Sequence, residues 1–208
     1  MDKLSVNEKV DKIVAYITFL GFDFSEDTRC NANDHIGATL ADAILQSGLN
    51  YRTVVKPRIE RILCTYPAYT TVTQVINLIN EIGANEFLNW NNTEKIKRFI
   101  ELLNMCKRHN IEYETDLKNW IIDHKNQEEL LSIRGIGPKT VDYLKLLLGL
   151  SSIPIDRHLL KFASLCEVKL TKYAEASTVY KLACEKLNVE YEALDYTIWN
   201  LMSSIAFS

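Results

Sequence analysis

The stretch LLSIRGIGPKTVDYLKLLLGLSSIPIDRHLL, residues 130–160, decides the fold that this sequence predicts. Gly135 suits the left-handed backbone conformation that follows many helix ends. Gly137 precedes Pro138, and proline is well placed at the first position of a new helix. The pattern therefore predicts two helices joined by a tight turn over residues 134–137.

This turn has the properties of a phosphate site. Its glycines let the backbone approach a ligand closely, and the start of the second helix favours an anion. No side chain in the turn would read a base edge, so contact with a nucleic acid here should be independent of sequence. We expect DNA contacts from Arg134, Gly135, Gly137 and Thr140.

Outward from this stretch, the sequence predicts helix almost throughout. Only seven glycines and four prolines occur in 208 residues, which argues against a barrel or sandwich of short strands. Residues 21–36 are polar and irregular. Helices are expected at residues 5–20, 37–49, 54–64, 70–82, 92–110, 114–124, 127–133, 138–149, 156–166, 172–188 and 192–206.

The composition is that of a soluble globular protein, with 47% apolar and 25% charged residues. The five cysteines are widely spaced and form no C-x-x-C pair, which predicts free reduced thiols rather than a zinc or iron–sulfur site. The charged N-terminus is unlike a signal peptide, and no apolar run would span a membrane. We expect an intracellular monomer, in the cytoplasm or nucleoid, with no membrane partner.

Charge is unevenly distributed, although the net charge is only −3. Residues 1–34 carry a net charge of −3, whereas residues 52–108 carry +4. The basic residues of the second region could be solvated helix faces or could follow the phosphates of a nucleic acid. Taken alone, the pattern favours solvated faces.

The sequence resembles the helix-hairpin-helix DNA glycosylase superfamily over residues 37–165. It carries that family's hairpin as Gly135-Ile136-Gly137-Pro138-Lys139, then a helix, then Ile155-Asp156-Arg157-His158. The branch of endonuclease III and the 8-oxoguanine DNA glycosylases is the most similar. Ile-Asp-Arg-His, together with LDYTIW at residues 194–199, is similar to the small 8-oxoguanine glycosylases of archaeal type.

The resemblance implies an all-α fold of two helical lobes with the helix-hairpin-helix motif at a central DNA-binding cleft. One lobe would span residues 30–150. The other would be discontinuous, with residues 1–29 plus residues 151–208.

The resemblance also implies two catalytic residues. Lys139 stands at the position of the lysine that forms a Schiff base with the sugar, and Asp156 at that of the aspartate that activates the nucleophile and stabilises positive charge on the sugar. Each has a plainer interpretation, because Lys139 could only contact a phosphate and Asp156 could only cap a helix. His158 matches the pattern too, and a structural role at the helix start suits it better than proton transfer.

Two loops are expected to fill the space left by an extruded base. The first supplies Gln46, Asn50, Tyr51 and Arg52, and the second supplies Trp90, Asn92 and Lys95. Trp90 could be a stacking wedge in DNA or could pack into the core. If the loops contact DNA, the interpretation of the neighbouring basic residues as contacts to the DNA phosphates becomes stronger.

The expected function is removal of an oxidised base, with 8-oxoguanine the first candidate, from duplex DNA, with abasic-site lyase activity. No cofactor is expected, because the four-cysteine run of endonuclease III is absent. The resemblance allows a monovalent cation at the hairpin. Two alternatives remain: a monofunctional glycosylase in which Asp156 activates water, and a non-catalytic DNA-binding protein.

Overall fold

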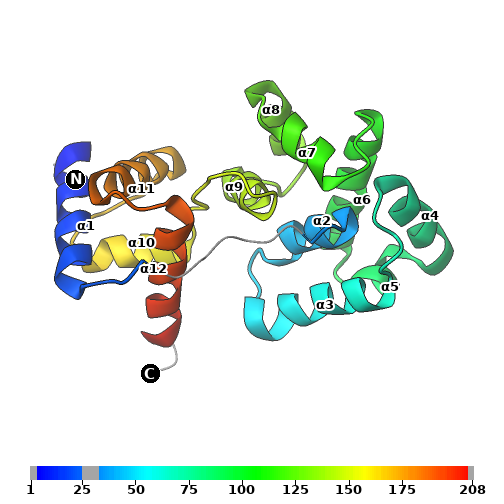
Figure 1. Cartoon of the computed structure of the whole chain (residues 1–208), viewed down its shortest axis with the longest axis horizontal. Helices are drawn as coiled ribbons and strands as arrows, with labels where there is room; N and C mark the ends of the chain where they lie inside the picture. The colour runs from blue at the N-terminus through cyan, green and yellow to red at the C-terminus, as the bar shows by residue number, and fades with distance from the viewer. Residues whose placement is uncertain (1–3, 25–32, 206–208) are drawn as a thin grey trace. The chain divides into compact units, whose positions relative to one another are not determined.

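The described residues of the computed structural model, 4–24 and 33–205, form helices and no strand, which confirms the all-α prediction (Figure 1). The helices are α1 (Val6–Leu20), α2 (Ile36–Leu45), the short π-helical turn η1 (Tyr51–Val55), α3 (Lys56–Thr65), α4 (Val72–Ile82), α5 (Ala84–Leu88), α6 (Thr93–Arg108), α7 (Glu114–Ile121), α8 (His124–Ser132), α9 (Pro138–Leu147), α10 (Arg157–Leu165), α11 (Tyr173–Leu187) and α12 (Tyr191–Ile205).

The differences from the expected helices lie mainly around the loops. Helix α2 ends at Leu45 rather than at residue 49, and α8 begins three residues before the expected residue 127. The turn η1 and helix α5 were not expected. Both are only five residues long, which is too short for a helical period to be recognised.

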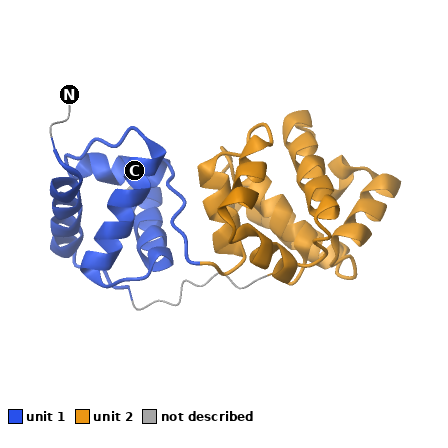
Figure 2. Ribbon diagram, turned by 90° about the horizontal axis from the view of Figure 1, so that it is seen from above, with its two compact units in different colours: residues 1–29, 151–208 blue, residues 30–150 orange. Residues whose placement is uncertain are grey.

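The chain divides into two compact units (Figure 2). Unit 1 comprises residues 1–29 and 151–208, and unit 2 comprises residues 30–150. Each unit has its own cluster of buried apolar side chains.

In unit 1, helix α1 packs against α11 and α10 packs against α12. Helix α1 contributes Val10, Ile13 and Ile17, whose spacing of three and four residues places them on one buried face. The hydroxyl of the buried Tyr180 on α11 donates a hydrogen bond of 2.5 Å to the backbone oxygen of Leu159. This bond ties α11 to α10, the helix that begins after Asp156.

In unit 2, helix α2 is buried along its whole length and contacts α3, α4, α6 and α9. Its sequence, IGATLADAIL, is apolar on nearly every side for that reason. Gly37 lets α4 come close, because a Cβ atom there would lie 2.8 Å from Cγ2 of Val75. Helix α2 is therefore the centre of unit 2, and its few polar side chains are sealed from solvent.

A buried polar cluster fixes the start of α2. The Nδ1 atom of His35 accepts a hydrogen bond from the backbone N–H of Ala38 at 3.1 Å, so Nε2 carries the proton and donates to the oxygen of Tyr66. Burial lowers the pKa of His35 below its usual 6.5. The carboxylate of Glu114 accepts hydrogen bonds from the side chain of Thr39 and from the backbone N–H of His35. These bonds anchor α2 to α7.

Candidate functional site

The turn between α8 and α9 has the predicted hairpin geometry. The backbone N–H of Ile136 donates to the oxygen of Ile133 at 2.9 Å, which closes the turn. Gly135 has a positive φ of 87°, and Gly137 is the N-cap of α9 with extended backbone. A Cβ atom on Gly137 would meet no atom within 4 Å. The start of α9, with the positive end of its helix dipole, is thus open to a close ligand.

Arg98 of α6 binds the turn between α8 and α9. Its Nε atom donates a hydrogen bond of 3.0 Å to the backbone oxygen of Arg134. The guanidinium lies so close to Gly135 that any side chain there would overlap it. Gly135 is therefore needed both for its backbone conformation and for the space that Arg98 occupies. Thr140, which we expected to contact DNA, is buried in the first turn of α9.

Lys139 lies in the first turn of α9, and its amine faces α2. The Nζ atom donates a hydrogen bond of 2.9 Å to Oε1 of Gln46, the C-cap residue of α2. Gln46 is only 9% exposed, and its Nε2 atom is buried with no hydrogen-bond partner within the described part of the chain. A buried unsatisfied donor costs about 1–3 kcal/mol. Gln46 is thus a partner of Lys139 in unit 2 and lies beneath the surface rather than at a loop tip.

A second polar contact joins the same two helices one turn away. The carboxyl of Asp42 on α2 accepts hydrogen bonds from the hydroxyl of Tyr143 on α9 at 3.1 Å and from that of Tyr51 at 3.2 Å. Asp42 is 2% exposed, and burial raises its pKa to about 6 despite the lowering effect of the two hydroxyls. Since Asp42 precedes Gln46 by four residues and Tyr143 follows Lys139 by four, the two contacts lie in register along facing helices.

Lys95 of α6 binds the C-terminal end of α2. Its Nζ atom donates to the backbone oxygens of Ile44, Leu45 and Ser47 at 2.8, 3.2 and 2.8 Å. These are the carbonyls that a helix end leaves without partners of its own. The pKa of Lys95 is lowered to about 8, chiefly by burial and then by the positive charges of Arg98 and Lys139. The expected DNA-contacting amine is therefore engaged inside unit 2.

The two expected loops also have local structural roles. Asn50 caps η1 by accepting from the backbone N–H of Thr53 at 3.0 Å, and Asn92 caps α6 by accepting from that of Lys95 at 3.0 Å. Their neighbour Arg52 is exposed. The loop residues thus lie at helix starts, where asparagine is favoured.

Trp90 is partly buried against the core of unit 2. The guanidinium of Arg58 lies 4.8 Å from the centre of its ring, and Nε of Arg58 donates to the oxygen of Asn89 at 3.0 Å. The indole Nε1 is buried without a hydrogen-bond partner among the described residues. This arrangement matches the core-packing interpretation of Trp90 in the unbound chain. Arg61 is similarly engaged, with the carboxylate of Glu86.

Asp156 and His158 lie in unit 1. Oδ1 of Asp156 accepts hydrogen bonds from the backbone N–H groups of His158 at 2.7 Å and Leu159 at 3.1 Å. Asp156 is therefore the N-cap of α10, as its plainer interpretation required. The ring of His158 stands edge-on to that of Trp199, with 6.4 Å between ring centres.

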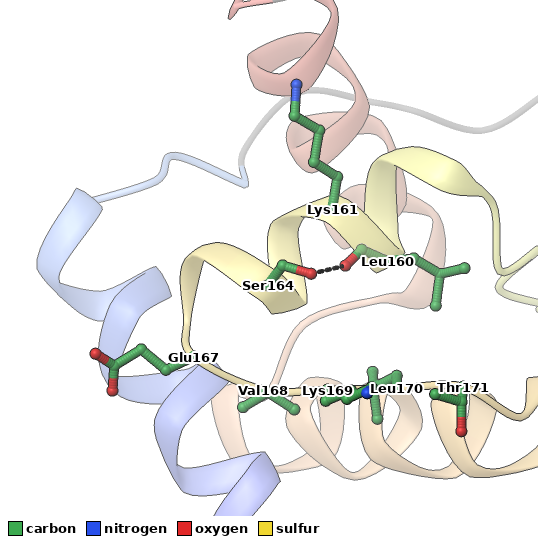
Figure 3. A pocket seen from close by; sticks show the side chains of 8 residues that line it. All are labelled: Leu160, Lys161, Ser164, Glu167, Val168, Lys169, Leu170 and Thr171. Atoms are coloured by element: carbon green, nitrogen blue, oxygen red, sulfur yellow. Dashed lines mark hydrogen bonds between the residues drawn. The ribbon is translucent and has the colours of Figure 1, made fainter. Parts of the chain in front are cut away.

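A shallow depression on unit 1 lies apart from these residues. It runs between α10 and the segment of residues 167–171, and Figure 3 shows the side chains that line it. The hydroxyl of Ser164 there donates a hydrogen bond to the backbone oxygen of Leu160 at 3.1 Å. The depression holds none of the expected site residues.

Asp42 and Tyr143 are the two polar side chains of this region that we had not singled out. The signal for Asp42 was present, because an acid in the apolar run ATLADAILQ must be buried with it. Tyr143 could have been found from the helical spacing of four residues that separates it from Lys139.

Metal and membrane features are not found within residues 4–24 and 33–205. No group of three or more His, Cys, Asp or Glu side chains there could hold a metal ion. None of the helices in those ranges has the length and apolar character needed to cross a membrane.

Comparison with known proteins gave one match. A family model described as a domain of unknown function (DUF8548) matches residues 31–203. No curated protein and no solved structure matches the chain.

Proposed function

This chain belongs to the family described as a domain of unknown function (DUF8548), and we propose that it removes a damaged base from duplex DNA and then cleaves the abasic site through Lys139. The proposed substrate is an oxidised base, with 8-oxoguanine as the first candidate. As the sequence resemblance implies, duplex DNA would bind in a cleft between two helical lobes. That arrangement is part of the proposal.

The observation that carries the proposal is the position of the Lys139 amine. It lies in the first turn of α9, directly after the Gly135–Gly137 turn, and is held by a hydrogen bond to a buried glutamine. A turn that binds a phosphate of the DNA backbone would bring the neighbouring sugar close to this amine. A lysine that only contacts phosphate would not need a partner buried beneath the surface.

The proposed reaction begins with the neutral amine of Lys139. Its lone pair forms a bond to C1′ of the damaged nucleotide as the glycosidic bond breaks, and the base leaves with that electron pair and takes up a proton. Loss of a proton from nitrogen and opening of the sugar ring give an imine. Removal of a proton from C2′ then expels the 3′ phosphate by β-elimination, which cuts the strand.

Asp156 keeps its proposed role through the resemblance alone. Its carboxylate would stabilise the positive charge that develops on the sugar. The cap on α10 is compatible with this role, because two backbone hydrogen bonds fix the direction of the side chain.

Borohydride trapping tests the proposal. Four labelled duplexes would carry 8-oxoguanine, an oxidised pyrimidine, an abasic site or no damage, and borohydride would reduce the imine to a stable amine. We expect a covalent band with a damaged-base duplex and with the abasic duplex. Lys139→Gln should abolish it, while the control Lys145→Gln, on the same helix and paired with Asp142 at 3.5 Å, should keep it.

Other outcomes of the trapping assay would favour a different function or a different nucleophile. Base release without trapping would favour a monofunctional enzyme in which Asp156 activates water. Salt-dependent duplex binding without trapping or base release would refute the proposal and favour a DNA-binding protein. Trapping that persists in Lys139→Gln would place the nucleophile elsewhere.

A further inference from the structure

Lys95 differs from a solvated surface lysine, because its ammonium is bound by backbone oxygens of the protein. Three backbone oxygens at the end of α2 surround its ammonium, and its side chain crosses from α6 to reach them. The end of a helix carries partial negative charge. Left open, the end of α2 would stabilise a second cation nearby, and the nearby cation is Lys139, bonded to the C-cap residue Gln46.

Lys95 and Lys139 are close enough to influence each other's charge. The positive charge of Lys139, with that of Arg98, is among the causes that lower the pKa of Lys95 to about 8. Electrostatic repulsion between two groups acts equally on both, so a protonated Lys95 disfavours the protonated form of Lys139 to the same extent.

We propose that Lys95 is a positioning residue that favours the neutral, nucleophilic amine of Lys139. It acts in two ways from one place: its ammonium occupies the negative end of α2, and its charge repels a proton on Lys139. This inference rests on the proposed function, because only a lysine that attacks carbon needs its free base.

Other charged groups lie on the elements that pack around Lys139. Helix α2 presents Asp42, whose carboxyl is bound by two tyrosine hydroxyls. Helix α6 presents Arg98 beside Lys95, and the hairpin carries Arg134. On α9 itself, Asp142 and Lys145 pair with each other, and α8 meets Lys145 through the neutral Gln127. Arg98 and Lys139 both lie close enough to Lys95 to affect its charge, and the buried carboxyl of Asp42 lies on α2 one turn before Gln46.

The protein without DNA can be used to test this inference. A limiting amount of acetic anhydride would label amines between pH 6 and pH 11, and mass spectrometry would measure labelling of the peptide that contains Lys139. For Lys95→Gln we expect the midpoint of labelling to rise by about one pH unit, so that labelling at pH 7 falls about tenfold. Lys95→Arg, which keeps the charge, should not raise the midpoint.

Lys97→Gln is the matched control. Lys97 lies on the same helix, but its side chain is 74% exposed and pairs with Glu94. Solvent screens such a charge, so its removal should leave the midpoint unchanged. An unchanged midpoint in Lys95→Gln, or an equal rise in Lys97→Gln, would overturn the inference.

The trapping assay separates failure of this inference from failure of the proposed function. Trapping of the abasic duplex at pH 7 should slow about tenfold in Lys95→Gln and recover as the pH is raised. If the wild type traps no DNA while the labelling midpoint shifts as expected, the proposed function is wrong and the influence of Lys95 on the amine stands. If Lys95→Gln does not fold, as judged by circular dichroism, a raised midpoint in Lys95→Arg would overturn the inference.

Discussion

The buried carboxyl of Asp42 should oppose folding at neutral pH. Burial raises its pKa from 3.8 to about 6, and Asp42 is only 2% exposed, so solvent screens the effect little. Because the pKa is raised on folding, the unfolded chain loses this proton first as the pH increases. The contribution of Asp42 to the free energy of unfolding therefore falls between about pH 4 and pH 6, by up to about 3 kcal/mol.

Asp42→Asn removes the charge and keeps the shape of the side chain. The amide can accept a hydrogen bond from one tyrosine hydroxyl and donate to the oxygen of the other. At pH 7, we expect the variant to be more stable than the wild type by about 1–3 kcal/mol. At pH 4, where the folded wild type carries a protonated carboxyl, the difference should be close to zero.

Guanidinium chloride unfolding at several pH values between 4 and 8 measures this difference. Trp90 and Trp120 report on unit 2, and far-UV circular dichroism follows the helices. Glu101→Gln, which removes an exposed acid from α6, is the control and should show no pH-dependent gain. A stability difference that is the same at pH 4 and pH 7, or an Asp42→Asn protein less stable than the wild type at pH 7, would refute the reasoning.

Four further substitutions test the hairpin and the cap of α10. Gly135→Ala should destabilise the protein by about 1–3 kcal/mol, because its positive φ disfavours any side chain and the added Cβ would overlap Arg98. Gly137→Ala has space and an ordinary φ, so chemical denaturation should show wild-type stability; a loss as large as that of Gly135→Ala would contradict this. Asp156→Ala should lose about 1 kcal/mol with the cap. Asp156→Asn should keep the cap and therefore the wild-type stability, but it should slow base release. Unchanged base release would mean that Asp156 acts only as the helix cap.

Much of the local structure could be predicted from short patterns. The Gly135–Pro138 run indicated the end of one helix and the start of the next, and the structure has that turn. Asp156 was expected to be catalytic, and its place before α10 also gave the plainer interpretation of a helix cap, which the structure has. Such features depend on interactions within about four residues of the chain, which sequence spacing describes directly.

The end of helix α2 is a feature that short sequence patterns did not indicate. Helix α2 was placed correctly, but it was expected to run to residue 49 and ends at Leu45. A helix buried on every side has no polar face, so its period carries no information on which neighbour each side chain meets. Gln46 was therefore assigned to a loop surface, whereas it is buried and bonded to Lys139.

The sequence alone determined that this protein is helical, where its hairpin lies and which lysine follows it. Only the tertiary structure decided what surrounds that lysine. Gln46 and Lys139 are 93 residues apart, and Asp42 and Tyr143 are 101 apart. The physical reason is that caps and turns are set by neighbouring residues, whereas the charge, burial and partners of an amine are set by the packing of whole helices against one another.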